Sequence, residues 1–139
     1  MRKYNFHDHK SVATHFDSSV HLCLVNNDDD ICNQKDYASI IGSLRYATDC
    51  TRPNIAYAIG VFSKFTSKPS KGHWLAIERV IRYLIGTKSY GILNKKYLAV
   101  IETFSDANWI TLLGDFLSTT GYIFTLGSGA ICWNLKSKQ

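Results

Sequence analysis

The sequence predicts an α+β fold in which about three helices are followed by three antiparallel strands. Between Asp36 and Gly86, apolar residues recur every three or four positions, which is the spacing of helices that bury one face. After Thr87 the spacing falls to two and β-type residues take over, as in strands. The chain is 45% apolar and 19% charged, which argues against a disordered polypeptide and for a folded one.

The first 35 residues predict an extended, poorly packed leader. They are polar and irregular, and the run from Asn26 to Asp30 is typical of a turn. The start of the chain lacks the apolar core of a secretory signal, and no stretch approaches the ~20 apolar residues that span a bilayer. We therefore expect an intracellular protein, in cytoplasm or nucleus, that has no membrane partner.

Three helices are expected next. The first runs from Asp36, as its N-cap, to about Ala47. The second lies between Thr51-Arg52-Pro53, where proline suits a first turn, and Lys68-Pro69-Ser70. The third runs from about Ser70 to Gly86. Their apolar stripes are expected to form the core, and they contain Tyr37, Ile40, Ile41, Leu44 and Ala47, then Ile55, Ala58, Ile59, Phe62 and Phe65, then Trp74, Ile77, Ile81 and Leu84.

The strands are expected in the last third of the chain. Tyr90 to Asn94 predicts a short strand, and Leu98 to Phe104 predicts a longer one. Thr119 to Leu126 and Ala130 to Leu135 form the clearest hairpin, joined at Gly127-Ser128-Gly129, where glycine permits a positive φ. With no helix after the hairpin, the strands predict an unfinished α/β layer in which neither face is covered.

The spacing of the residues does not predict a zinc site, a calcium site or a hydrolase active site. The four histidines of the leader match no standard zinc site, and the four cysteines contain no CxxC pair and are expected to be free thiols. Counted from Asp28, a calcium loop has Asn33 in place of its glycine and Ser39 in place of its glutamate. No G-x-S-x-G motif accompanies the serine, histidine and aspartate residues, so a hydrolase is not expected.

Several segments, in one order, carry a resemblance to a known family. They are YASIIGSLRYATDCTRPNIAYAIGVFSKF at 37–65, GHWLAIERVIRYLIGT at 72–87, FSDANW at 104–109 and STTGYIFTLGSGAICWNLKSKQ at 118–139. Over nearly its whole length the chain resembles the Pol polyprotein of copia-type LTR retrotransposons. The matching region of that family leads from the end of reverse transcriptase into ribonuclease H, which opens with a Ser-Asp-Ala-Asp-Trp pattern.

The resemblance implies three parts of the chain. Residues 1–35 correspond to a polar linker after the polymerase thumb, and residues 36–97 to a helical connection region. Residues 98–139 correspond to a truncated ribonuclease H-like domain that contains its first three strands. The chain departs from the family where it has Asn54 and Asn108 in place of aspartate, and where Phe116-Leu117 replace a basic Arg-Lys pair. These changes suggest a decayed copy.

The resemblance also implies that this chain is not an enzyme on its own. No Tyr-x-Asp-Asp pattern of the polymerase site occurs in it. Ribonuclease H chemistry needs two Mg²⁺ ions held by several carboxylates, and Asp106, expected just beyond the end of a strand, is the one residue that matches a metal-binding position. A lone carboxylate binds Mg²⁺ weakly at best. We therefore expect Mg²⁺ as cofactor in the intact parent enzyme, and no cofactor and no turnover here.

Basic residues suggest the activity that remains. Sixteen Lys and Arg against eleven Asp and Glu give a net charge of +5, which suits contact with phosphates. We expect weak, salt-sensitive binding of an RNA–DNA hybrid or other nucleic acid by side chains of the helical half, namely Arg52, Lys64, Lys71, Arg79 and Arg82. Trp74 and Trp133 lie on faces that predict packing in a core rather than stacking on bases.

Three other interpretations stay open. In the first, the basic side chains form an ordinary solvated helix surface and bind no nucleic acid. Alternatively, the chain is a protein-interaction module whose uncovered hairpin, with Tyr122, Phe124, Ile131 and Trp133, docks on a partner or drives self-association. The third interpretation is a genomic relic with no selected function.

Overall fold

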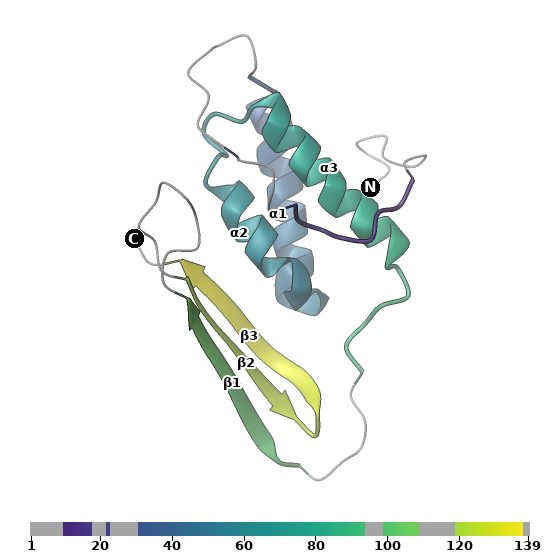
Figure 1. Cartoon of the computed structure of the whole chain (residues 1–139), viewed down its shortest axis with the longest axis vertical. Coiled ribbons are helices and arrows are strands. Elements are labelled where there is room, and N and C mark those ends of the chain that lie inside the picture. Colours follow the sequence, from purple (N-terminus) through teal and green to yellow (C-terminus); the bar gives the residue numbers. More distant parts are fainter. Residues whose placement is uncertain (1–9, 18–21, 23–30, 94–98, 109–118, 138–139) are drawn as a thin grey trace.

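A computed structural model of the chain describes residues 10–17, 22, 31–93, 99–108 and 119–137. In these residues a group of α-helices is followed by one open sheet, as Figure 1 shows, and the predicted α+β order is confirmed. The elements in chain order are α1 (Gln34–Thr51), the short 3-10 helix η3 (Pro53–Ile55), α2 (Ala56–Ser63), α3 (Lys71–Gly86), β1 (Ile101–Asn108), β2 (Thr119–Leu126) and β3 (Gly129–Ser137).

Helix α1 begins earlier and ends later than predicted. Its N-cap is Asn33, whose side-chain Oδ1 accepts hydrogen bonds from the backbone N–H groups of Lys35 (3.0 Å) and Asp36 (3.4 Å). Asp36 is therefore not the N-cap but lies in the first turn, where a negative charge favours the helix dipole. The helix continues to Thr51 because the first residue whose backbone Pro53 constrains is Arg52.

The second predicted helix is divided and shorter. Pro53 opens η3, which leads directly into α2, and α2 ends at Ser63 rather than near Lys68. The residues that follow form successive turns closed by backbone hydrogen bonds, such as that from Phe65 N–H to Phe62 O (3.1 Å). Phe65 still reaches the apolar core, where its ring stacks on that of His73 at a centroid separation of 4.0 Å. The predicted stripe is thus confirmed although the helix ends before Phe65.

Helix α3 is confirmed over its predicted range. Ser70 is its N-cap and forms a capping box with His73, in which the Ser70 side chain accepts from the His73 backbone and the His73 ring accepts from the Ser70 backbone. Thr87 ends the helix, and its N–H donates to Tyr83 O (3.0 Å). Ile77, Ile81 and Leu84 of the predicted stripe are buried, and His73 and Val80 are buried beside them.

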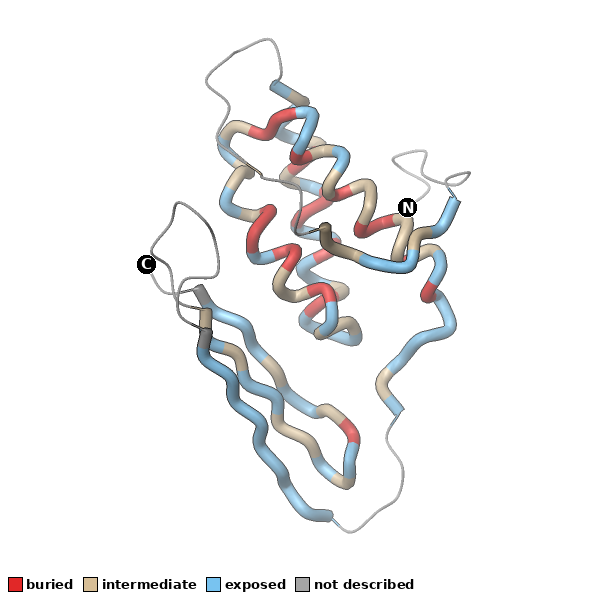
Figure 2. Tube along the Cα trace, viewed as in Figure 1, coloured by how far each residue is buried: buried red, intermediate tan, exposed pale blue. Residues whose placement is uncertain are grey.

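The core lies among the three helices and holds most of the buried apolar side chains in the described residues, as the red segments of Figure 2 show. Tyr37 of α1 is fully buried, and its hydroxyl donates to Phe62 O of α2 (3.0 Å). Burial raises the pKa of the Tyr37 hydroxyl, which therefore remains a neutral donor. The other buried apolar residues are Ile40, Ile41, Leu44, Ile55, Ala58, Ile59, Val61, Phe62, Ile77, Val80, Ile81 and Leu84.

The leader is irregular, as predicted, but part of it is packed. Residues 10–17 run across α3, as Figure 1 shows. Phe16 contacts the core, with its ring 5.3 Å from that of Tyr57 and 6.1 Å from that of Phe62. Leu22 also packs against the core. The prediction of a poorly packed leader is therefore wrong for these residues, because polar composition does not reveal two apolar side chains that anchor a segment.

The sheet has the order β1-β2-β3 with both pairs antiparallel. The hairpin is confirmed, and its two-residue loop has a positive φ at Gly127 (54°) and Ser128 (68°). Strand β1 was predicted to end at Phe104, but it extends to Asn108 because Thr119–Tyr122 of β2 pair with its polar end. The predicted strand at Tyr90 is wrong: Tyr90–Leu93 are irregular, and the Tyr90 N–H closes a turn on Thr87 O (3.0 Å).

Two predictions about strands fall partly outside the described residues, at Asn94 and Leu98. Ala99 and Val100 lie before β1, and Val100 O accepts from the Gly127 N–H (3.2 Å) of the hairpin loop. Figure 2 shows that most of the described sheet is exposed or half-buried.

One face of the sheet meets the helices through β3, so that face is partly covered. Trp133 donates its indole N–H to Thr48 O of α1 (3.0 Å). The register places Phe104, Ile123 and Trp133 directly opposite one another on this face. In the part of the chain that the structure describes, no helix has the length and apolar character needed to cross a membrane.

Candidate nucleic-acid interface

Asp106 lies within β1 rather than beyond its end. It pairs with Gly121 of β2, and its side chain shares a face with Phe104 and Ile123. This face and the start of α2 enclose an apolar hollow of about 240 Å³, which Asp106 lines together with Pro53 and Ala56. Asp106 is exposed to solvent.

The surroundings of Asp106 do not fit a Mg²⁺ cage. Among the described residues, no three His, Cys, Asp or Glu side chains lie close enough together to hold a metal ion. Glu102, the other carboxylate of β1, lies four residues away, or roughly 13 Å along a strand. Mg²⁺ prefers near-octahedral oxygen coordination, which one carboxylate and water satisfy only weakly.

Arg52, one of the five predicted nucleic-acid contacts, has a structural role. Its guanidinium donates to Thr87 Oγ1 (3.3 Å) and to Thr87 O (2.5 Å), and Thr87 is the C-cap of α3. A cation at this end of a helix is favoured by the helix dipole. Arg52 therefore fastens the end of α1 to the end of α3, and its side chain is only partly open to solvent.

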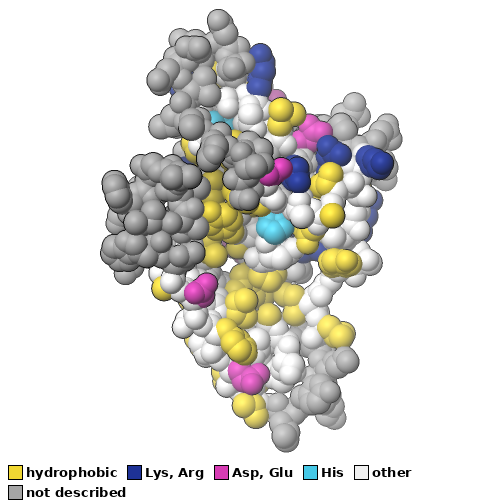
Figure 3. All heavy atoms as spheres, in the orientation of Figure 1, with side chains coloured by type: hydrophobic (Ala, Val, Ile, Leu, Met, Phe, Trp, Pro, Cys, Tyr) yellow, Lys and Arg dark blue, Asp and Glu magenta, His cyan; other side chains and the backbone are white. Residues whose placement is uncertain are grey.

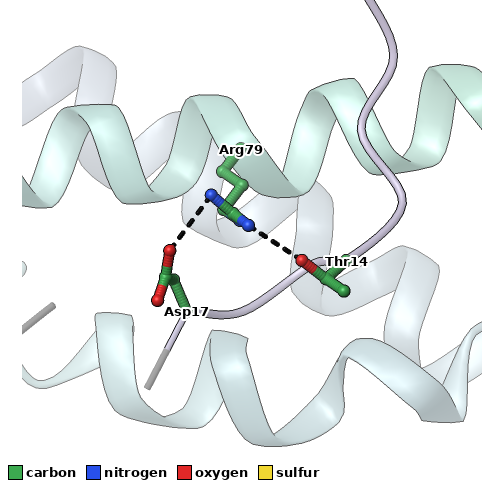
Figure 4. A network of polar contacts seen from close by, with 3 residues as sticks. All are labelled: Thr14, Asp17 and Arg79. Atoms are coloured by element: carbon green, nitrogen blue, oxygen red, sulfur yellow. Dashed lines mark hydrogen bonds and ion pairs between the residues drawn. The ribbon is translucent and has the colours of Figure 1, made fainter. Parts of the chain in front are cut away.

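Arg79 and Arg82 hold the leader on α3. Figure 4 shows the Arg79 guanidinium between two leader side chains: Nη1 lies 3.3 Å from Asp17 Oδ2, and Nη2 donates to Thr14 Oγ1 at 2.8 Å. Arg82 Nε donates to Lys10 O at 2.7 Å. The interaction with Asp17 leaves both partners about one-third exposed, so it is a surface ion pair. Both guanidinium groups keep part of their surface open to solvent.

Lys64 and Lys71 are exposed and stand at the other end of the helices. Lys64 is the C-cap of α2, and Lys71 is the first residue of α3. Lys71 and Arg82 are eleven positions apart, which places them on nearly the same side of α3 and roughly 16 Å apart along its axis. Of the predicted residues, Lys71 and Arg82 thus follow one side of α3, Arg79 lies roughly 80° round the helix from Lys71, and Arg52 and Lys64 belong to other helices.

The two halves of the chain differ in charge. Residues 31–93 contain nine Lys and Arg against three Asp and Glu, whereas the described sheet residues contain Lys136 against Glu102 and Asp106. Figure 3 shows the blue Lys and Arg side chains over the helical half. The leader adds little positive charge at neutral pH through His15, because burial lowers the pKa of its imidazole. The helical half therefore carries most of the positive charge of the described residues.

Sequence reasoning missed the partners of the arginines. Asp17 and Thr14 precede Arg79 by more than sixty residues, and no local spacing connects them. It also did not predict that Arg45 and Lys136 border one polar hollow between α1, α2 and β3. These residues come from distant segments, so only the packing of the sheet on the helices brings them together. Trp74 packs against the core, as predicted, and Trp133 is half-buried with its indole N–H bonded to Thr48 O.

Comparison with known proteins identifies relatives over most of the chain. The chain is 35% identical to the retrovirus-related Pol polyprotein from transposon TNT 1-94 of Nicotiana tabacum, over an alignment of 144 positions that covers 100% of the chain. It is 37% identical over 131 residues to the corresponding polyprotein from transposon RE2 of Arabidopsis thaliana, a match to 94% of the chain. The chain spans only 11% and 9% of the length of these two relatives.

A third relative is of similar length to this chain. The secreted RxLR effector protein 161 of Plasmopara viticola is 38% identical over 104 residues, which are 74% of the chain and 73% of that relative. No family model matches the chain. No solved structure matches it either.

Proposed function

Because the chain belongs to the retrovirus-related Pol polyproteins of copia-type transposons, we propose that it is the segment joining reverse transcriptase to ribonuclease H and that it binds nucleic acid without cleaving it. In the intact parent, the polyprotein copies RNA into DNA and degrades the RNA strand, and this segment helps to hold the RNA–DNA hybrid. The separate chain retains weak binding to the phosphate backbone and is not itself an enzyme.

The uneven charge of the two halves is the observation that carries this proposal. Nine basic residues against three acidic ones in residues 31–93 give the helices a positive surface, and Lys71 and Arg82 follow one side of α3. Lys and Arg side chains that neutralise phosphates release counterions, so the binding is independent of sequence and weakens with salt. Arg52 contributes least, because its guanidinium is engaged with Thr87.

The proposed lack of cleavage rests on the surroundings of Asp106. Its exposed carboxylate shares its face of the sheet with apolar side chains, and the described residues bring no group of metal ligands to it. Two-metal hydrolysis needs carboxylates that hold both ions beside the scissile bond. Binding by Lys and Arg side chains needs no metal.

Filter binding of a labelled RNA–DNA hybrid tests the proposed binding. We expect retention that falls as salt is raised from 50 to 300 mM, with a log–log slope steeper than about −2. The variant Lys71→Gln with Arg82→Gln should lower the affinity about tenfold at low salt, whereas Glu102→Gln on the sheet should not lower it. Retention that is absent at 50 mM salt would remove the proposal.

A second candidate function is a protein-interaction module. It is favoured by the apolar side chains on the face of the sheet that points away from the helices, where Ile101, Tyr122 and Leu126 are 66%, 37% and 40% exposed. The relative from Plasmopara viticola, which has about the same length as this chain, is named as an effector protein and not as a polyprotein, and this also favours a function outside a polyprotein. Light scattering after gel filtration distinguishes the two: a monodisperse monomer up to about 0.1 mM counts against self-association through this face.

A further inference from the structure

Strand β1 forms an open edge of the sheet. It pairs with β2 along all 8 of its residues, and no strand among the described residues lies on its other side. Figure 1 shows β1 at the edge farther from the helices, whereas β3, at the other edge, packs on α1 and α2. In a strand with one neighbour, alternate residues point their backbone N–H and C=O groups to the open side. Strand β1 therefore offers a row of backbone donors and acceptors to a further strand.

Strand β1 lacks most of the features that prevent pairing at a sheet edge. Its sequence contains no proline and no lysine, and its register with β2 runs without the shift that occurs between β2 and β3. Residues 101–107 are all exposed, as the pale blue tube of Figure 2 shows. Only two charged side chains, Glu102 and Asp106, oppose pairing. The edge is thus open to a strand that matches these two charges.

The two carboxylates lie on the face of the sheet that points toward the helices. Glu102 and Asp106 share this face with Phe104, which stands midway between them, because side chains alternate along a strand. They are four positions apart, or roughly 13 Å. Lys136, the one basic residue of the described strands, pairs with Thr120 and therefore lies on the opposite face. The described part of the helix-facing side is locally acidic, although the whole chain is positive.

An apolar hollow adjoins the middle of this edge. It has a volume of about 240 Å³, and Phe104 and Asp106 line it together with Pro53 and Ala56 of the helical half. This is less than the roughly 300 Å³ of a small-ligand pocket. A side chain placed opposite Phe104 on an added strand lies beside the hollow, because cross-strand neighbours on one face are roughly 5 Å apart. The hollow therefore suits one apolar side chain.

We propose that β1 accepts an extended segment of another protein as a further strand of the sheet. This segment has two Lys or Arg residues four positions apart, which match Glu102 and Asp106, and an apolar residue midway, which lies beside Phe104. Backbone hydrogen bonds supply the affinity of such an added strand, and the alternate side chains supply its selectivity. The pattern reads the same in both directions, so it serves a parallel or an antiparallel strand. This inference does not rest on the proposed nucleic-acid binding, which uses cations of the helices.

A second copy of β1 matches the edge less well. Two copies paired antiparallel about Phe104 set Glu102 of one opposite Asp106 of the other, and like charges directly opposite destabilise a sheet. The same two carboxylates attract a basic strand. Charge thus favours a basic segment over self-association at this edge.

Calorimetric titration of the full chain with the peptide TKTFTKT tests the inference. Lysine and phenylalanine alternate with threonine in this peptide, so the three face one side of a strand. We expect binding in 50 mM salt, and Glu102→Gln with Asp106→Asn should weaken it about tenfold, because two charge-assisted contacts are lost. Asp36→Asn with Glu78→Gln is the matched control, which makes the same change in net charge on the helices and should change the affinity less than twofold.

Two further measurements separate strand addition from general attraction of charges. A TKTFTKT peptide with N-methyl groups on two successive residues keeps every side chain but loses one N–H that faces β1, so it should bind at least tenfold more weakly. Amide hydrogen exchange, followed by mass spectrometry, should slow in residues 101–108 when TKTFTKT is added. The charge-reversed peptide TETFTET should slow exchange there only in the variant Glu102→Lys with Asp106→Lys.

Several results would overturn the inference while leaving the proposed nucleic-acid binding untouched. No heat of binding at 1 mM TKTFTKT, equal affinity for the N-methylated peptide, or unchanged exchange in residues 101–108 would each do so. A chain that is a dimer by light scattering, with residues 101–108 protected before peptide is added, would also overturn it, because a second copy would then occupy the edge.

Discussion

His73 shows how one side chain controls the start of a helix. The Ser70 N–H donates to His73 Nδ1 (2.9 Å), so Nδ1 carries no proton and the hydrogen of the neutral ring lies on Nε2. The ring is 1% exposed and stacks on Phe65. In the described residues Nε2 is buried without a hydrogen-bond partner. Burial lowers the pKa of the imidazole below its usual value, because the site disfavours the charged form.

This geometry predicts a loss of stability in mild acid. Because the folded-state pKa of His73 lies below the unfolded value of 6.5, the unfolded chain binds more protons there. The free energy of unfolding should therefore be highest above about pH 6.5 and fall as the pH drops through the folded pKa. Urea unfolding between pH 5 and 8 measures this. His15 adds a slope of the same sign.

The variant His73→Gln isolates the contribution of His73. Glutamine at this position of a capping box also accepts from the N-cap backbone but does not titrate. We expect the variant to retain α3 and to show a shallower fall in stability from pH 7 to pH 5, while His15→Gln removes the remaining part of the slope. A His73→Gln chain with an unchanged pH dependence would show that protonation of this ring is not coupled to folding.

At the scale of elements, the close approach of the leader to α3 depends on Gly86. A Cβ atom added at Gly86 would lie 2.9 Å from Ser11 Cβ, so Gly86→Ala must displace the leader. We expect faster tryptic cleavage after Lys10, measured by mass spectrometry. Gly42→Ala is the matched control, because a Cβ atom there meets nothing within 4 Å. It should leave this cleavage unchanged and stabilise α1 by about 0.5–1 kcal/mol. Equal cleavage rates in both variants would contradict the role of Gly86.

In the proposed function, the leader competes with phosphate for Arg79, because Asp17 is ion-paired with that guanidinium. Asp17→Asn removes the negative charge that lies 3.3 Å from Arg79 Nη1, so the affinity for an RNA–DNA hybrid should rise severalfold. The slope of log affinity against log salt concentration should also become steeper, by the amount that about one additional phosphate contact contributes. Glu102→Gln makes the same change in net charge on the sheet and should raise the affinity less. Stability should change by under about 1 kcal/mol, since the pair is at the surface. A decrease in hybrid affinity with Asp17→Asn would contradict the competition.

The elements differ in how far the sequence predicts them. Helix α3 has its apolar stripe, its N-cap and its end within the local sequence, and its range was predicted correctly, although its N-cap at Ser70 was not named. Strand β1 extends through the polar run from Ser105 to Asn108 because β2 pairs with it, and pairing is a long-range property. Tyr90 follows strand-type residue preferences but is held in a turn by Thr87. Local patterns thus predict the elements whose partners are local.

The sequence predicted which residue types make up the candidate interface, but it did not predict which partners these residues contact in the fold. The basic residues of the helical half stand out by composition, and Lys64 and Lys71 are exposed as that expectation requires. That Arg52 secures Thr87 and that Arg79 secures Asp17 depends on contacts across thirty-five and more residues.

At the scale of the molecule, the helical half and the sheet contribute different things. The helices have a buried core and the positive charge, whereas the described sheet has exposed apolar side chains and one basic residue, Lys136. Contacts of α1 and α2 with β3, including the bond from Trp133 to Thr48, join the two halves.

The central claim is that the chain binds an RNA–DNA hybrid and does not cleave it. The direct measurement is incubation of the chain with a hybrid labelled on its RNA strand, with Mg²⁺, scoring retention and cleavage in the same samples and using Asp106→Asn as the control. We predict salt-sensitive retention, intact RNA, and identical results for Asp106→Asn. Cleavage that requires Mg²⁺ and disappears in Asp106→Asn would contradict the account, because it would mean that a complete metal site forms around Asp106.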